Sequence, residues 1–133
     1  MPGGRFFDSN VLIYSISGDD AKTAAAREHL AGRGAISVQV LNEVANVARN
    51  KMAMTWLEIR ETISVFQAGL IVHPLSVRTH NLGLTLAERH GLHIYDAMIV
   101  AAALEADCDT LYSEDMHAGL VVDGRLTIVN PFA

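Results

Sequence analysis

Residues 6–14 read FFDSNVLIY. The paired phenylalanines are typical of a short buried strand that ends at Asp8, and the apolar spacing after it predicts a helix at residues 11–15. An acid at or near such a junction recurs in LNE at 41–43, YDA at 95–97 and SED at 113–115. In an open parallel sheet these junctions lie along one edge, so acids far apart in the sequence become neighbours.

The rest of the chain alternates short apolar runs with longer segments of helical periodicity. Strands are expected at residues 5–7, 35–38, 70–73, 109–112 and 125–129, and further helices at 20–31, 40–49, 76–90, 96–106 and from a Thr55 cap to about 67. Thr55 and Glu58 form a capping box, and Gly91 is a typical helix stop. Strands separated by helices predict an α/β fold, a three-layer α/β/α sandwich with a central, mostly parallel sheet of about five strands, in one domain over residues 1–133.

Composition limits the class of protein. A net charge of −5 over 133 residues argues against a chain that binds nucleic acid over its whole surface, so any such site must be local. The single Cys108 excludes an internal disulfide and suits a reducing compartment. Residues 1–5 show no secretory leader, and the longest nearly apolar stretch, 97–104, is far shorter than the roughly 20 residues that cross a bilayer. We expect a cytoplasmic protein without membrane contact.

Each acid also has an ordinary structural explanation. Asp8 and Asp96 could be helix N-caps, Glu43 could be solvated on an amphipathic helix, and Glu114 and Asp115 could lie in a solvated turn. However, the neighbours of Glu43 along its helix are apolar, and the helix after Asp96 is apolar nearly all round. Such a helix is buried, so an acid at its start needs a cation or hydrogen-bond donors. The four segments taken together carry more weight than any single acid.

Clustered carboxylates suit one kind of chemistry. Magnesium takes a few carboxylate oxygens, keeps several waters and completes its shell with phosphate. The bound ion can activate water and polarise a phosphoryl oxygen. The pattern therefore points to a metal-dependent nuclease.

The successive segments FDSNVLIY, Glu43, YDAMIVAAA and LYSEDM resemble the signatures of PIN domains, over essentially the whole chain. Their order and spacing are most similar to VapC-like ribonucleases, the toxins of bacterial and archaeal toxin–antitoxin pairs. The resemblance implies a set of four acids that bind Mg²⁺ or Mn²⁺ and carry out catalysis: Asp8, Glu43, Asp96 and Asp115. It also implies two supporting polar side chains, Asn10 and Ser113. It leaves the roles of Glu114 and His93 open.

The resemblance further implies endonucleolytic cleavage of RNA by metal-activated water, a cognate antitoxin that blocks the site, and a homodimer. Two other classes stay open. One is an Asp-dependent phosphotransfer or receiver-type domain in which Asp8 accepts the phosphoryl group. Such sites normally use a lysine, and only Lys22 and Lys51 are present, neither after a late strand. The other is a PIN-like binding module without catalysis, which RNA cleavage by the pure protein would exclude.

Overall fold

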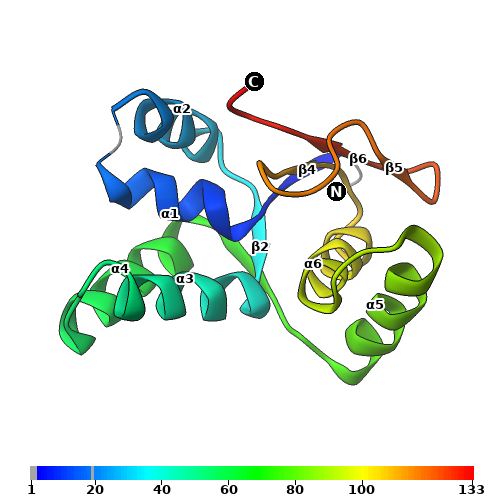
Figure 1. Cartoon of the computed structure of the whole chain (residues 1–133), viewed down its shortest axis with the longest axis horizontal. Helices are drawn as coiled ribbons and strands as arrows, with labels where there is room; N and C mark the ends of the chain where they lie inside the picture. Colours follow the sequence, from blue (N-terminus) through cyan, green and yellow to red (C-terminus); the bar gives the residue numbers. More distant parts are fainter. Residues whose placement is uncertain (1–2, 19) are drawn as a thin grey trace.

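The computed structural model describes residues 3–18 and 20–133 (Figure 1), so Met1 and Pro2, the start of the segment expected to carry no leader, lie outside the described residues. The described elements are β1 (Gly4–Phe7), α1 (Ser9–Ser17), α2 (Asp20–Ala31), β2 (Ala35–Ser37), α3 (Val38–Asn50), α4 (Trp56–Gly69), β3 (Ile71–His73), α5 (Val77–His90), α6 (Ile94–Glu105), β4 (Cys108–Tyr112), β5 (Val121–Val122) and β6 (Leu126–Val129).

The strands form one sheet in the order β3-β2-β1-β4-β6-β5, and each neighbouring pair is parallel except β5 with β6. Helices α1 to α4 lie on one side of the strands and α5 and α6 on the other (Figure 1). The predicted α/β class with a mostly parallel sheet is confirmed. The chain builds β1, β2 and β3 outward in one direction and then returns to place β4 on the other side of β1. The carboxyl ends of β1 and β4 therefore meet where the strand order reverses, which is where open α/β sheets bind ligands.

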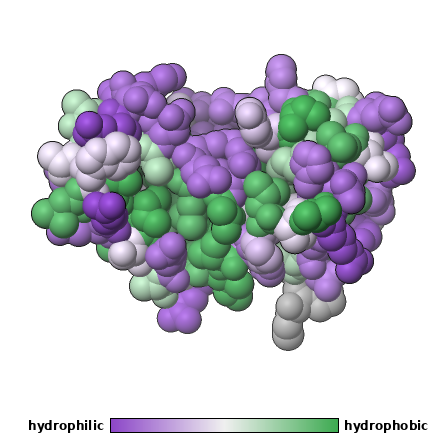
Figure 2. All heavy atoms as spheres, turned by 90° about the horizontal axis from the view of Figure 1, so that it is seen from below, coloured by the Kyte–Doolittle hydropathy of each residue, from purple (hydrophilic) through white to green (hydrophobic). Residues whose placement is uncertain are grey.

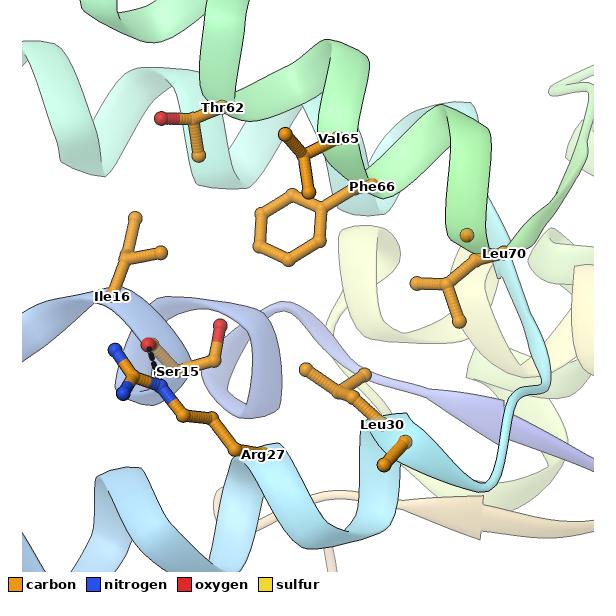
Figure 3. Close-up of a pocket in the computed structure, with 10 residues that line it drawn as sticks. Ser15, Ile16, Arg27, Leu30, Thr62, Val65, Phe66 and Leu70 are labelled. Carbon is orange, nitrogen blue, oxygen red and sulfur yellow. Dashed lines mark hydrogen bonds between the residues drawn. The ribbon is translucent and has the colours of Figure 1, made fainter.

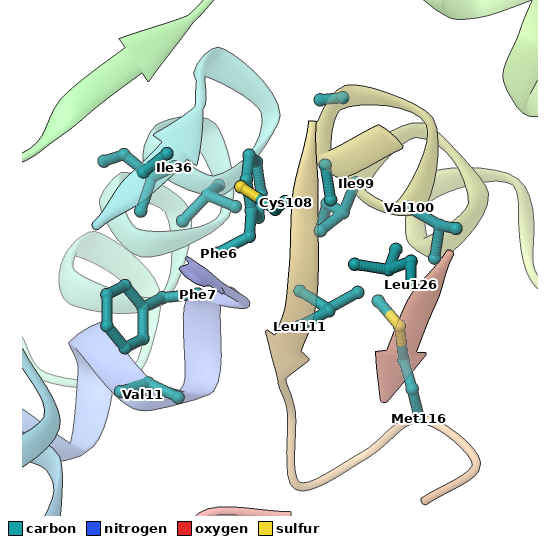
Figure 4. Packing of buried hydrophobic residues seen from close by; sticks show 14 of the residues in the cluster. Phe6, Phe7, Val11, Ile36, Ile99, Val100, Cys108, Leu111, Met116 and Leu126 are labelled. Atoms are coloured by element: carbon teal, nitrogen blue, oxygen red, sulfur yellow. The ribbon is translucent and has the colours of Figure 1, made fainter. Parts of the chain in front are cut away.

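The core is built around β1, β4 and α6. Phe6 and Phe7 are fully buried, together with Leu111 of β4 and Ile99 of α6 (Figure 4). Every residue of α6 from Ala97 to Leu104 is buried, as its all-round apolar sequence predicts. Gly83 of α5 lets that helix approach closely, because a Cβ there would lie 2.7 Å from the sulfur of Met98. This packing fixes α6 and the acid in its first turn.

Several boundaries differ from the sequence expectation. Helix α1 begins at Ser9, two residues earlier than predicted, with Asp8 as its N-cap. Helix α6 begins at Ile94 because Gly91, at φ 66°, ends α5 and leaves His93 as the N-cap. Asp96 is therefore in the first turn rather than at the cap. The capping box of Thr55 and Glu58 is present.

The sheet has one strand more than the five expected. Strand β5 has only two residues and pairs antiparallel with β6 across a turn in which Asp123 and Gly124 have φ of 51° and 64°. A two-residue strand carries no measurable periodicity, so the sequence pattern could not indicate it. Among the described residues, no helix is both long and apolar enough to span a membrane.

Candidate active site

Asp8 lies at the centre of the candidate site. Phe7 pairs with Tyr112 across β1 and β4, so the residues that follow them, Asp8 and Ser113, lie side by side. The Asp8 carboxylate accepts hydrogen bonds from the Ser9 amide at 2.7 Å, the Ser113 hydroxyl at 2.7 Å and the Asn10 side-chain amide at 3.2 Å. Its side chain is 2% exposed. Asp8 is thus the N-cap of α1. Its buried carboxylate is also held in place by Ser113 and Asn10.

Asn10 links two of the predicted acids. Its Nδ2 donates to Asp8 Oδ2 at 3.2 Å and to Asp115 Oδ2 at 3.3 Å, while its Oδ1 accepts from the backbone amide of Glu114 at 3.2 Å. One amide therefore joins the start of α1 to the segment after β4. The structure places Asn10 and Ser113 among the acids that they were predicted to support.

Glu43 reaches the same edge from α3. Its Oε1 accepts from the Ser9 hydroxyl at 2.7 Å and its Oε2 from the Gln39 amide at 3.1 Å, so both carboxylate oxygens are oriented. Neither donor was singled out from the sequence. Gln39 stands four residues before Glu43 on one helix, a spacing at which side chains meet, and this is the only sequence signal for it.

Asp96 completes the group. Its half-buried carboxylate has no hydrogen-bond partner within the described residues. It is close enough to Glu43, Asp115 and His93 to interact with their charges. The structure thus brings all four predicted acids to one edge of the sheet.

The electrostatics of the site disfavour ionised carboxylates. Burial raises the pKa of Asp8 to about 6; hydrogen bonds from Ser113 and Ser9 oppose the shift, and the charges of Glu43 and Asp96 add to it. Burial, followed by the charge of Glu43, also raises the pKa of Asp96, whereas His93 lowers it. A cation among these groups would relieve both the repulsion and the loss of hydration.

The residues fit one kind of cation and not another. Within the described residues, no three carboxylate, imidazole or thiol groups converge closely enough to enclose a metal ion by themselves. A closed structural zinc site needs such convergence, whereas magnesium takes one or two carboxylates and keeps waters and substrate phosphate. A Mg²⁺ or Mn²⁺ ion beside Asp8 would therefore need waters or substrate oxygens in addition to the carboxylates.

Glu114 has a different partner from its neighbours. The ammonium of Lys22, in the first turn of α2, donates to Glu114 Oε1 and to the hydroxyl of Tyr14 at 3.2 Å. Tyr14 packs edge-on against Phe132, with ring centres 5.0 Å apart. The sequence interpretation set Lys22 aside because it follows no late strand, but tertiary folding brings it to the segment after β4. Glu114 thus connects that segment to α2.

Comparisons with known proteins concern the family and the fold. The model of the PIN domain family matches residues 5–118. A toxin–antitoxin complex from Klebsiella pneumoniae is 22% identical, with 96% of this chain and 97% of that chain covered and a TM-score of 0.73. DNA-bound VapBC from Salmonella typhimurium is 18% identical, with 98% and 99% covered and a TM-score of 0.68. The sarcin-ricin-loop-cleaving toxin VapC20 of Mycobacterium tuberculosis is 16% identical, with 84% and 89% covered and a TM-score of 0.67.

At these identities the solved structures show a shared fold and do not establish a shared substrate or partner. Among curated proteins, no sequence matches the chain.

Proposed function

The chain belongs to the PIN domain family, and we propose that it is a metal-dependent endoribonuclease, the toxin of a type II toxin–antitoxin pair. One observation carries the proposal. The Asn10 amide bridges the carboxylates of Asp8 and Asp115 at the sheet edge where the charges of Glu43 and Asp96 also act. Carboxylates held together by polar side chains are what an open site for a hard cation requires.

The chain's own residues divide the work of such a site. A divalent cation, when bound, would supply an activated water and polarise a phosphoryl oxygen. Asn10 and Ser113 orient Asp8 and Asp115, while Ser9 and Gln39 orient Glu43. We assign Asp96 the role of accepting a proton or holding a water. Its carboxylate is available for this because it has no protein hydrogen bond within the described residues.

The decisive experiment is cleavage of structured RNA by the purified protein, with Mn²⁺ or with a chelator. We expect cleavage only with metal, and loss of most activity in Asp8→Ala, Glu43→Ala, Asp96→Ala and Asp115→Ala. Glu114→Ala should lose less. Asp109→Ala is the matched control, because Asp109 is an exposed acid on β4. Absence of cleavage by the native chain, or equal cleavage by Asp8→Ala, would refute the proposal.

The phosphotransfer alternative is weakened by the burial of Asp8. A carboxylate that is 2% exposed and whose two oxygens both accept hydrogen bonds is poorly placed to attack a phosphoryl group. The inactive binding module remains the second candidate, because the same geometry without bound metal would have the fold and no chemistry. The cleavage experiment separates the two.

The proposal includes an antitoxin, and we propose that it binds an apolar cavity on one side of the molecule. A cavity of about 420 Å³ lies between α1, α2 and α4. Ile16, Leu30, Phe66 and Leu70 point into this space, and Val65 stands at its rim (Figure 3). The Arg27 guanidinium lines the same cavity, donating to the Ser15 carbonyl at 3.0 Å. This apolar groove with one cation suits an amphipathic helix that carries an acid opposite Arg27.

Helix α1 carries residues of both the cavity and the acidic site. Ile16 and Ser9 are seven residues apart on α1, which corresponds to about 10 Å along a helix. A partner in the groove could therefore continue to the carboxylates and block them. We expect Val65→Asp to abolish rescue of growth by the co-expressed antitoxin, while Val121→Asp, at a similarly exposed site on β5, leaves rescue intact. Equal rescue of both variants would exclude this cavity as the binding site of the antitoxin.

A homodimer is also part of the proposal. Apolar surface is visible on the face seen in Figure 2. The first turns of α5 and α6 contribute exposed apolar side chains, Val77 at 78% and Tyr95 at 66% exposure. Contiguous apolar surface of this kind marks protein interfaces. Val77→Asp should shift the native chain toward monomer in sedimentation, and an unchanged mass would exclude this face.

A further inference from the structure

The exposed face of α3 leads away from the acids. Glu43 lies in the second turn of the helix, and the side chains of Asn42, Asn46 and Asn50 are exposed on the way to its end. The Asn50 amide donates to Asn46 Oδ1 at 2.7 Å. From Glu43 to Asn50 the helix advances about 10 Å. This face therefore offers a line of amide donors and acceptors that carries no acid after Glu43.

The far end of that face carries an exposed tryptophan. Trp56, the first residue of α4, is 57% exposed. The guanidinium carbon of Arg49 lies 4.6 Å from the centre of the indole ring, and Arg49 Nη1 also donates to the Met54 carbonyl at 3.1 Å. The exposed indole ring, with a cation held beside it, offers a flat apolar surface on which a planar ligand could stack.

The cations at this end have no carboxylate partner among the described residues. Lys22, Arg78, Arg89 and Arg125 each form an ion pair with a carboxylate. Arg49, Lys51 and Arg60 form none within the described residues, and all three belong to the α3–α4 region at the lower left of Figure 1. These three cations are close together in the chain and are accompanied on α4 by two exposed acids, Glu58 and Glu61, so they leave a small local excess of positive charge that a phosphate could contact.

We propose that the α3 track, defined as Asn46, Asn50, Arg49, Trp56 and Arg60, binds a single-stranded segment of the RNA whose cleavage site lies at the acids. A base stacks on Trp56, and its phosphates contact Arg49 and Arg60. Exposed aromatic rings beside cations bind single strands in this way without reading sequence. The inference rests on the proposed ribonuclease function, which it extends by naming the element that holds the substrate strand.

A second copy of the chain fits this end less well than RNA. A two-fold interface places the same patch of both subunits together. Arg49, Lys51 and Arg60 would then face their own copies, and like charges across an interface disfavour association. A phosphate backbone instead complements all three cations.

The experiment uses the only tryptophan of the chain as its probe. The Asp96→Asn protein, chosen to prevent cleavage, is titrated in chelator with single-stranded RNA of about 10 nucleotides, within the usual range of single-strand sites. Labelled RNA reports binding independently. We expect quenching of Trp56 emission in parallel with binding, and roughly tenfold weaker binding for Trp56→Ala with recovery in Trp56→Phe.

Charge variants test the phosphate contacts. Arg49→Gln and Arg60→Gln should each lower the slope of log affinity against log salt by about 1, whereas Arg78→Gln on α5 should not. In the cleaving protein, Trp56→Ala should raise KM for RNA and leave kcat unchanged. Thermal melts of the variants confirm that the fold is retained.

The outcomes separate the two proposals. If the native chain cleaves no RNA, the proposed function fails. If it cleaves RNA while Trp56 emission and KM do not respond, only the track is wrong. Emission that changes with protein concentration in the absence of RNA would assign Trp56 to an interface between copies and would equally overturn the track.

Discussion

The hydroxyl of Ser9 donates a 2.7 Å hydrogen bond to Oε1 of Glu43, which joins the first turn of α1 to α3. Ser9 follows Asp8 directly, and its backbone amide binds the Asp8 carboxylate. One residue thus positions two carboxylates that come from different parts of the chain. Groups that orient metal-binding carboxylates matter nearly as much as the carboxylates themselves.

Ser9→Ala should therefore weaken Mn²⁺ binding and RNA cleavage by about 10- to 100-fold, because Glu43 loses one of its two donors. Ser17→Ala on the same helix is the control, since that exposed hydroxyl donates to the Tyr14 carbonyl and contacts none of the acids among the described residues. Calorimetric titration of Mn²⁺ and initial cleavage rates provide the measurements. Equal metal affinity in both variants would contradict the positioning role.

Stability without metal should depend on the ionisation of Asp8. Its pKa is about 6 in the folded protein against 3.8 as the ordinary value, so between these values the folded state binds more protons than the unfolded state. Unfolding free energy in chelator should fall as pH rises from about 4 to 6, by at most about 3 kcal/mol, and level off above that. Asp8→Asn should flatten this slope, and Asp109→Asn should not. Denaturant melts at several pH values measure it.

Asp96→Asn should make the metal-free protein more stable and should abolish the stabilisation by Mn²⁺. Removing this charge relieves its repulsion with Glu43 and Asp115, so the melting temperature in chelator should rise by about 2–5 °C. Mn²⁺ should stabilise the native chain if it binds only the folded state, and this gain should vanish in the variant. Glu61→Gln, at an exposed acid on α4, should behave like the native chain. Identical melting curves of the native chain in chelator and in Mn²⁺ would exclude a shared metal site.

The contact between Lys22 and Glu114 should matter more for activity than an ordinary surface ion pair. Glu114 lies between Ser113 and Asp115, and its amide binds Asn10, so loosening it displaces the candidate site. Lys22→Met and Glu114→Gln should each reduce cleavage several-fold, with little further loss in the double variant because both changes break one contact. The Arg89–Asp123 pair, with an N···O distance of 2.9 Å, is the control and should not affect cleavage. Additive losses would indicate two separate roles.

The sequence predicted the elements whose signals are local. The buried strands β1 and β4 and the apolar helix α6 follow from their own residues, and the capping box at Thr55 fixes the start of α4. The start of α6 was placed too late because Asp96 looked like a cap, whereas the left-handed Gly91 leaves room for His93 to take that position. The start of α6 is therefore determined by the turn at Gly91 and not by Asp96.

The candidate site divides in the same way. Asp8 and Glu43 lie near junctions of a parallel strand with a helix, whereas α6 with Asp96 follows helix α5, and Asp115 lies between β4 and β5. All four acids could be found because an apolar run stops or a helix begins close to each of them. Ser9, Gln39 and Lys22 could not, because a polar residue on a helix surface looks the same whether it is solvated or in contact. Lys22 meets Glu114 across 92 residues, and only the folded sheet determines that contact.

The hydrogen bond from Ser113 to Asp8 joins residues 105 positions apart in the sequence. This separation determines when each part of the site becomes available during synthesis. During synthesis, Asp8 and Glu43 leave the ribosome long before β4 exists to pair with β1. At about 5–20 residues per second, several seconds pass before the second half of the site appears. An incomplete nascent chain therefore carries acids without the geometry to use them. The proposed nuclease site is therefore assembled late in synthesis, after β4 has been made and has paired with β1.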